Sequence, residues 1–489
     1  MQNSGSFFYS LALSLLLILC PGVCEESKAD QKPNVLFIAA DDLRCDLACY
    51  GDPFVKTPHL DQLAKRGVLF KQAYCQQALC NPSRASLMTG RRPDSLKIWD
   101  LPTHFREVDP TIVTLPQLFK QQGYFTQNIG KIFHNWRQKI QGDPASWSVP
   151  AVLHYATHGS DKPVLNDNRE LPMDFAKMSR NECRDVPDSA YFDGRIADLA
   201  VQAIREVKRK QEPFFLAVGF WKPHLPFNPP KKYWDLYQDS KITVADNPKP
   251  PINAPAIALH NGQELLRSMK RDLTKAEIIE LRTGYLAGIS YLDAQIGKVI
   301  AELDRQGLRD NTIIVFWSDH GFHLGEHGLW CKTSNFENDA HVPLMISVPN
   351  TNQAGKTSNA LVELLDMYPT LVELCHLPKP EYLEGKSLVP ILNDSTQTVK
   401  RAAFTQHPRP AYYKGAPNHM GVSVRTPRYR YTEWRNFKTG KVEARELYDH
   451  EIDPEENTNI ADNPSDKAAF QKAVQLLEEQ FPRKTTQKR

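Results

Sequence analysis

The chain has 489 residues, of which 24% are charged and 41% are hydrophobic, and its formal net charge is +3. With a mean hydropathy of −0.48, these values exclude a disordered chain, a collagen and a polytopic membrane protein. Basic residues are spread along the whole sequence, which argues against a nucleic-acid-binding protein. The length predicts two unequal domains.

The first 24 residues contain no Lys, Arg, Asp or Glu, and the run from Phe7 to Cys20 is almost entirely apolar. Such a run is too short to span a bilayer and is typical of the core of a secretory signal peptide. We therefore expect residues 1–24 to be a signal peptide cleaved near Cys24, with no membrane span in the mature chain. A lipoprotein signal and a buried N-terminal helix are the less favoured alternatives.

The sequence contains nine cysteines, two of which would leave with the signal peptide. In an oxidising compartment, an odd remainder means that at least one cysteine is not in an intramolecular disulfide. The pairing of the others is left open by the sequence. The remaining cysteines are Cys45, Cys49, Cys75, Cys80, Cys183, Cys331 and Cys375.

Four short apolar runs predict buried strands, at residues 35–40, 214–219, 313–317 and 342–348. Continuous runs, rather than alternating ones, favour a parallel sheet that is covered on both faces. Helical patterns lie between them, at residues 57–67, 114–123, 188–210 and 274–307, the last opened by a capping box from Thr274 to Glu277. This order predicts a doubly wound α/β fold, which binds ligands at the carboxyl ends of its strands.

The pattern changes near Asp394. Short strands are predicted at residues 404–406, 420–425 and 428–434, followed by a helix at 467–481. We therefore predict a catalytic domain over residues 25–394 and a smaller α+β subdomain over residues 395–489. Residues 225–262 are rich in Pro and Asn and are expected to form an irregular surface excursion.

Two acidic pairs follow predicted buried strands. Asp41 and Asp42 come after the first strand, and Asp319 and His320 come after the third. Such pairs converge at the edge of a doubly wound sheet, and adjacent carboxylates repel unless a cation lies between them. Three carboxylates and one imidazole are mainly hard oxygen ligands, which favours Ca²⁺, with Mg²⁺ next, over Zn²⁺. The alternative is that both pairs are solvated loop residues.

The segment Cys80-Asn-Pro-Ser-Arg84 is the most specific signal in the chain. Pro82 suits the first turn of a helix, so Cys80 is expected at a helix N-terminus, where an anion is favoured. Arg84 would lie one turn further on and hold the Cys80 side chain and a metal in place. An unmodified cysteine at this position is expected to be an activated thiolate. The alternative is a structural or disulfide-bonded cysteine.

The segment Cys80-x-Pro-Ser-Arg84, followed by Leu87-x-Thr-Gly-Arg-Arg92, resembles the signature of the type I sulfatases. The resemblance extends from about residue 33 to the tail motif that ends at Asn459. It implies an alkaline-phosphatase-like fold and conversion of Cys80 to formylglycine by a maturation enzyme. It also implies one calcium ion held by Asp41, Asp42, Cys80, Asp319 and His320. The catalytic residues implied are Cys80, Arg84, Lys131, His134, His224 and Lys332.

In such an enzyme the formylglycine aldehyde is hydrated, and one of its oxygens attacks sulfur and displaces the sugar alcohol. An alcohol is a poor leaving group, so an acid must protonate it, and we assign this role to His224 helped by Lys332. Lys131 and Lys332 would neutralise charge on the sulfuryl oxygens. His134 would accept the proton of the second hydrate oxygen as sulfate leaves.

Two features depart from the commonest sulfatase pattern. The second metal pair is Asp-His rather than Asp-Asn, and two residues rather than one separate Lys131 from His134. Both features resemble the branch of the family that acts on 2-sulfated iduronate. The favoured substrate is therefore a 2-O-sulfated uronate end group of a glycosaminoglycan, with residues 151–185 and 235–262 facing it.

Three alternatives remain at this point: a sulfatase for another sulfated polysaccharide, a phosphonate monoester or phosphodiester hydrolase on the same fold, and a non-catalytic glycan-binding relative. The complete set of site residues argues against the last. The expected location is the secretory pathway, which means the periplasm or exterior of a bacterium or the lysosome of an animal. The expected partners are a sulfated saccharide and the maturation enzyme, with no nucleic acid.

Overall fold

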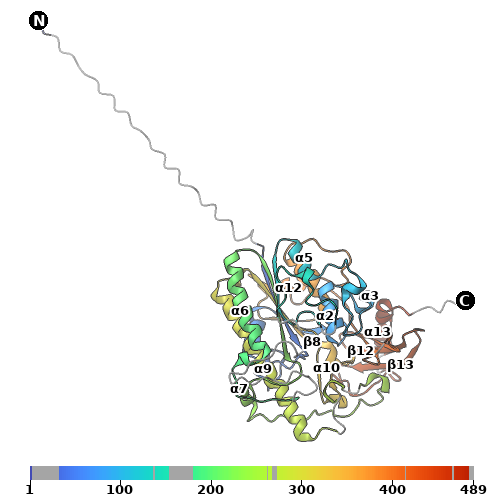
Figure 1. Ribbon diagram of the computed structural model, residues 1–489. Coiled ribbons are helices and arrows are strands. Elements are labelled where there is room, and N and C mark those ends of the chain that lie inside the picture. Colours follow the sequence, from blue (N-terminus) through green and yellow to red (C-terminus); the bar gives the residue numbers. More distant parts are fainter. Residues whose placement is uncertain are drawn as a thin grey trace. The chain divides into compact units, whose positions relative to one another are not determined.

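The computed structural model describes residues 1–2, 32–135, 138–152, 180–260, 263–266, 272–412, 415–464 and 467–483. Most of the predicted signal peptide and most of the region 151–185 lie outside these ranges. Residues Pro33–Arg489 form one compact unit, shown in Figure 1. Within the described ranges, no helix is both long enough and apolar enough to cross a membrane.

The centre of this unit is a seven-stranded sheet in the order β3-β4-β1-β5-β8-β2-β9. Its strands are β1 (Asn34–Asp41), β2 (Val68–Tyr74), β3 (Phe125–Gly130), β4 (Phe214–Pro223), β5 (Thr312–Ser318), β8 (His341–Ser347) and β9 (Lys356–Glu363). The predicted mostly parallel sheet is confirmed, with one correction. The run at 342–348, which we expected to be a parallel strand, is β8, and it pairs antiparallel with both β5 and β2.

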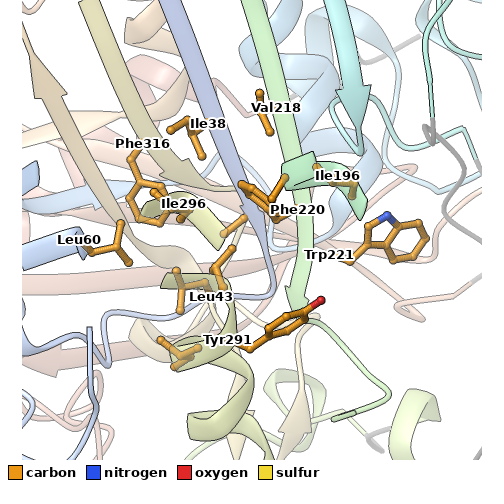
Figure 2. Packing of buried hydrophobic residues seen from close by; sticks show 14 of the residues in the cluster. Ile38, Leu43, Leu60, Ile196, Val218, Phe220, Trp221, Tyr291, Ile296 and Phe316 are labelled. Atoms are coloured by element: carbon orange, nitrogen blue, oxygen red, sulfur yellow. The ribbon is translucent and has the colours of Figure 1, made fainter. Parts of the chain in front are cut away.

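Helices cover both faces of the sheet, as the unbroken apolar strands predicted. Alternate side chains of β1 enter two different cores, with Ile38 in one and Phe37 in the other. The first core is closed by α1 (Pro58–Arg66), α6 (Phe192–Lys210) and α9 (Lys275–Arg305), and the second by α2 (Cys80–Thr89), α5 (Leu115–Gln121), α11 (Met367–Leu374) and α12 (Val389–Asn393). Figure 2 shows Ile38 and Val218 of the strands among Ile196 of α6 and Ile296 of α9.

The predicted long helices are present, and the capping box at Thr274 and Glu277 is confirmed at the start of α9. The helix expected from residue 188 begins later, at Phe192, after a short 3-10 turn at Asp188–Ala190. The Tyr291 hydroxyl of α9 donates a hydrogen bond to the Asp188 carbonyl and accepts one from the Gly194 amide. This tertiary contact interrupts the helix, and the local sequence does not encode it.

The C-terminal part forms a four-stranded antiparallel sheet of β10 (Ala403–Arg409), β11 (His419–Arg425), β12 (Tyr429–Asn436) and β13 (Val442–Asp449). Helix α13 (Lys467–Gln480) packs on it through Leu476 and Leu477. The predicted α+β character is confirmed, with β13 as an additional strand, while the boundary at residue 394 stays a prediction. Short elements lie in the connections: α3 (Pro93–Leu96), α4 (Phe105–Val108), α7 (Lys231–Trp234), α8 (Gln263–Leu266), α10 (Glu337–Ala340), β6 (His323–Leu324) and β7 (Trp330–Cys331).

Candidate active site

Four neighbouring parallel strands, β3, β4, β1 and β5, end at the same edge of the central sheet. The residue after β3 is Lys131, the residue after β4 is His224, and β1 ends in the pair Asp41 and Asp42. Strand β5 is followed by Asp319 and His320. The sheet topology therefore brings together side chains that lie far apart in the sequence, from Asp41 to His320, because parallel strands share one carboxyl edge.

Two backbone features fix the ends of these strands. The Lys131 amide donates a 2.8 Å hydrogen bond to the Gly219 carbonyl, and a Cβ atom at position 219 would lie 2.0 Å from the Lys131 carbonyl oxygen. Glycine at 219 is therefore required for Lys131 to approach β4 this closely. Asp42 has a left-handed backbone with φ 63°, which is strained for a residue with a side chain and is typical of functional sites.

Cys80 is the first residue of α2, as the position of Pro82 predicted. Its side chain is buried, and its Sγ lies 3.5 Å from Asp41 Oδ1 and 3.3 Å from His320 Nε2. The expectation of an activated thiolate is wrong for the unmodified side chain. Burial, followed by the negative charge of Asp41, raises the pKa of the Cys80 thiol well above its ordinary value. These two effects on the pKa outweigh the opposite effects of the helix N-terminus and of nearby Lys131, which lower it.

Arg84 lies one turn along α2 and is fully buried, at 0% exposure. Its Nε donates to Asp319 Oδ2 at 2.8 Å, and a terminal nitrogen lies 3.4 Å from Asp41 Oδ1. The same guanidinium donates to the backbone carbonyls of Lys131 at 2.6 Å and of Ala40 at 2.9 Å. Arg84 therefore links the ends of β1, β3 and β5 to the helix that carries Cys80.

The residues predicted to hold a metal lie together. Donor atoms of Asp41, Cys80, Asp319 and His320 all lie within 4.8 Å of one another, and Asp42 Oδ1 lies 3.4 Å from His320 Nε2. The three carboxylates are completely buried. Buried carboxylates this close need positive charge, and their oxygens are the donors that Ca²⁺ and Mg²⁺ prefer. The residues present therefore fit a hard divalent cation.

Lys131 and His134 lie on the side of the site next to β3. The Lys131 ammonium forms an ion pair with Asp41 and lies 5.3 Å from the centre of the Trp221 ring. Burial is the largest single influence and works against charge on Lys131, yet Asp41, Cys80 and Asp319 together outweigh it and raise the pKa of this lysine. Burial, and then the charge of Lys131, lowers the pKa of His134 well below its ordinary value. His134 is therefore a neutral imidazole, which can accept a proton.

His224 and Lys332 both approach Asp42. Lys332 Nζ lies 2.9 Å from Asp42 Oδ2, and His224 Nε2 lies 3.8 Å from the same oxygen. A residue that the sequence did not indicate joins them. Glu264 Oε1 lies 3.0 Å from His224 Nε2, and Glu264 Oε2 lies 2.6 Å from Lys332 Nζ. No motif surrounds Glu264, and its only sequence signal is its place next to the expected substrate-facing region.

Tyr412, after β10, is a second residue that the sequence did not indicate. Its side chain is 40% exposed, while its hydroxyl is influenced by Glu264, Lys332 and Cys80. Burial of the hydroxyl, and then the charge of Glu264, raises its pKa well above the ordinary value. The C-terminal subdomain thus contributes an exposed aromatic ring beside the site.

The seven described cysteines from Cys45 to Cys375 are all free thiols. His323 and His327 follow shortly after Asp319 and His320 in the sequence. Both are buried, His323 against Asp339 Oδ1 at 2.7 Å and His327 against the Glu455 carbonyl at 2.8 Å. These contacts support a structural role for both.

The sequence of the chain matches those of known proteins. The sulfatase family pattern matches residues 33–377, and the pattern described as N-sulphoglucosamine sulphohydrolase, C-terminal, matches residues 325–484. The chain is 34% identical to "Iduronate 2-sulfatase" of Mus musculus, over 92% of this chain and 95% of that protein. It is 32% identical to the Homo sapiens protein of the same name, over 96% and 98%.

Solved structures agree with the fold. A structure of a protein in complex with its substrate D-glucosamine-2-N,6-O-disulfate superposes with a TM-score of 0.73 at 23% identity, covering 92% of this chain and 97% of that one. A phosphonate monoester hydrolase from Silicibacter pomeroyi gives a TM-score of 0.71 at 22% identity, with coverages of 92% and 94%. The predicted alkaline-phosphatase-like fold is confirmed. Because the sulfatase pattern covers most of the chain and both sequence relatives match along nearly their whole length, the chain belongs to the sulfatase family and is a sulfuric ester hydrolase.

Proposed function

We propose that this protein hydrolyses the 2-O-sulfate ester of an iduronate or related uronate at the end of a glycosaminoglycan chain, with Cys80 as the precursor of its nucleophile. The observation that carries the proposal is the position of Cys80, at the N-terminus of α2 and within 3.5 Å of both Asp41 and His320. The substrate assignment is supported by the identity of about one third to two proteins named iduronate 2-sulfatase.

Conversion of Cys80 to formylglycine would supply a hydrated aldehyde whose oxygen attacks sulfur. Arg84 would hold this side chain in place through Asp319 and Asp41. Lys131 and Lys332 would bind the sulfuryl oxygens and offset the charge that they gain in the transition state. His224 would protonate the departing sugar oxygen, and neutral His134 would accept a proton as sulfate leaves.

We also propose one bound calcium ion, held by Asp41, Asp42, Asp319 and His320 together with residue 80. Such an ion supplies positive charge that polarises oxygen ligands. The proposal is supported by the three buried carboxylates and their mutual distances. Lys131 and Arg84 also face Asp41, and Lys332 faces Asp42.

The same proposal includes a maturation enzyme that oxidises Cys80 and a location in the secretory pathway. That location would be the periplasm or exterior of a bacterial cell, or the lysosome of an animal cell. The support is the apolar segment Phe7 to Cys20, followed by the acidic pair Glu25 and Glu26.

The proposal is tested with protein made in a host that has the maturation machinery. Peptide mass analysis should show residue 80 about 18 Da lighter than cysteine. Sulfate release from a 2-sulfated iduronate disaccharide should fall to background in Cys80→Ala, because the nucleophile is missing. Cys375→Ala, which removes a buried cysteine far from the strand ends in sequence, is the control and should retain turnover.

An aryl sulfate and a phosphodiester are assayed in parallel. Faster turnover of the phosphodiester than of either sulfate ester would contradict the proposed reaction. Faster turnover of a different sulfated saccharide would contradict only the choice of sugar. Retained sulfate release in Cys80→Ala would show that the nucleophile is another residue.

A further inference from the structure

Glu264 bridges the two residues on the leaving-group side of the site. It lies on the short helix α8, and its two carboxylate oxygens contact different cations, with Oε1 at 3.0 Å from His224 Nε2 and Oε2 at 2.6 Å from Lys332 Nζ. Its side chain is only 17% exposed. A buried carboxylate that divides its oxygens between two cations fixes the positions of both.

The position of Glu264 is itself fixed by its neighbour. Leu265 is 2% exposed and packs in the core on the α6 and α9 side of the sheet. Its carbonyl accepts a 2.7 Å hydrogen bond from Arg180 Nε. Helix α8 also contacts β7, the strand that directly precedes Lys332. The backbone that carries Glu264 is therefore attached to the segment that carries one of its two partners.

The contacts of His224 determine the direction in which its ring faces. Nδ1 lies 2.6 Å from the Leu225 carbonyl oxygen, and Nε2 lies 3.0 Å from the Glu264 carboxylate. A carbonyl and an ionised carboxylate can only accept hydrogen bonds. Both ring nitrogens of His224 therefore act as donors, and Glu264 holds the Nε2–H bond on the side of the ring that faces Lys332 and Asp42.

We propose that Glu264 is a positioning residue that orients His224 and Lys332 toward the bridging oxygen of the substrate. This inference rests on the proposed function, since it assumes that His224 protonates a departing sugar alcohol. In that step the bridging oxygen takes the place of Oε1 at the Nε2–H bond while an oxygen of the hydrated residue 80 forms a bond to sulfur. The bond between sulfur and the bridging oxygen then breaks, and the Nε2 proton moves to the departing alcohol. Glu264 keeps its contact with Lys332 through Oε2 and so stays beside the reacting groups.

Substrates with different leaving groups separate this role from a structural one. A sugar alcohol needs protonation as it departs, whereas a nitrophenol is stable as its anion and leaves without an acid. Glu264→Gln keeps the size of the side chain but loses the charge. We expect kcat for a 2-sulfated iduronate disaccharide to fall about 10- to 100-fold, and kcat for 4-nitrophenyl sulfate to change less than about 2-fold.

Two further variants complete the experiment. Glu264→Asp restores the carboxylate on a shorter stem and should recover part of the lost kcat on the disaccharide. Glu280→Gln removes an exposed carboxylate on α9 and should match the wild type on both substrates. Thermal melting of each variant shows whether it folds. If Glu264→Gln does not fold, the two substrates are compared with Glu264→Asp instead.

Each remaining outcome overturns the proposal. Equal losses on both substrates would mean that Glu264 only maintains the structure of the site. Unchanged rates would mean that His224 is oriented without it. Faster turnover in Glu264→Gln would mean that the carboxylate blocks the position that the substrate needs. A wild-type enzyme that releases no sulfate from either substrate would refute the proposed function instead, before Glu264 is considered.

Discussion

Arg84 is the residue on which the arrangement of the strand ends depends most directly. It has no exposed surface, and it contacts two carboxylates and the backbone of two strand ends. A guanidinium offers five donors in a fixed plane, whereas a lysine ammonium offers three at a single point. Lysine at this position therefore cannot satisfy Asp319, Asp41 and the backbone carbonyls together.

We expect Arg84→Lys to lower the free energy of unfolding by about 3–5 kcal/mol, because it leaves buried charge and carbonyl groups unpaired. Urea denaturation followed by tryptophan fluorescence measures this loss. The control is Arg91→Lys, just beyond the same helix, where the partly exposed pair with Asp109 contributes about 0–1 kcal/mol. Equal losses in the two variants would contradict the central position given to Arg84.

The sequence indicated most of the residues that the structure brings together at the strand ends, and it missed two residues that lie beside them. Cys80, Arg84 and the acidic pairs stand in recognisable motifs or directly after apolar strands, so their approach follows from the fold. Glu264 and Tyr412 reach the site only through tertiary packing, and neither stands in a pattern. Lys332, which we expect to help His224, contacts the same two carboxylates as His224, those of Glu264 and Asp42.

Among the elements, α9 supports α1 through a buried carboxylate. Asp293 of α9 accepts hydrogen bonds from the amides of Leu60 at 2.7 Å and His59 at 3.2 Å, in the first turn of α1. Burial is the largest influence on the pKa of Asp293. It raises this pKa to about 7, although the two amide hydrogen bonds lower it. The folded protein therefore holds a proton on Asp293 at a pH where the unfolded chain has released it.

The sign of the pH effect follows from this difference. Between pH of about 4 and 7 the folded state binds more protons, so the free energy of unfolding falls as pH rises through this window. Asp293→Asn has no such proton, so its stability relative to the wild type should rise with pH, by up to about 4 kcal/mol. Denaturant midpoints at pH 5 and pH 8 measure the change. A relative stability that falls with pH would contradict the raised pKa.

The strand prediction succeeded at the centre of the sheet, where burial is complete, and missed β2, β3 and β9. Half-buried Lys71 and Gln72 interrupt the apolar run of β2, which lies between β8 and β9. β1, β4 and β5 lie at the centre, so both of their faces need apolar side chains. β3 and β9 are edge strands, and β9 begins with exposed polar residues, so no apolar run indicates them. The reversed direction of β8 could not be predicted, because an apolar run has the same composition in either direction.

In the whole molecule, the C-terminal sheet is joined to the catalytic part by buried ion pairs. Arg430 of β12 contacts Glu337 of α10, and its Nε lies 2.7 Å from Glu456. The Glu337 amide donates a 2.7 Å hydrogen bond to the same Glu456 side chain. Because Arg430 is 1% exposed, loss of its side chain would leave two buried carboxylates without their main cation.

We expect the chain from residue 33 to unfold in one calorimetric transition, since Pro33–Arg489 is one compact unit. Arg430→Ala should move that whole transition to lower temperature, with a loss of about 3–5 kcal/mol. Arg428→Ala, in which the lost side chain was 36% exposed, is the control and should move the transition less than Arg430→Ala does. Two transitions, of which only the smaller one moves, would show that the two sheets unfold independently.

The four strand ends and helix α8 differ in how well they tolerate amino-acid substitution. The groups next to Cys80 stand at the ends of the central strands, where each substitution disturbs neighbours on several elements. Glu264 and Tyr412 stand on connections outside that sheet, which tolerate insertion and exchange far better. New sugar preferences can therefore arise in this scaffold, by evolution or by engineering, through replacement of those connections while the bond-breaking apparatus is inherited intact.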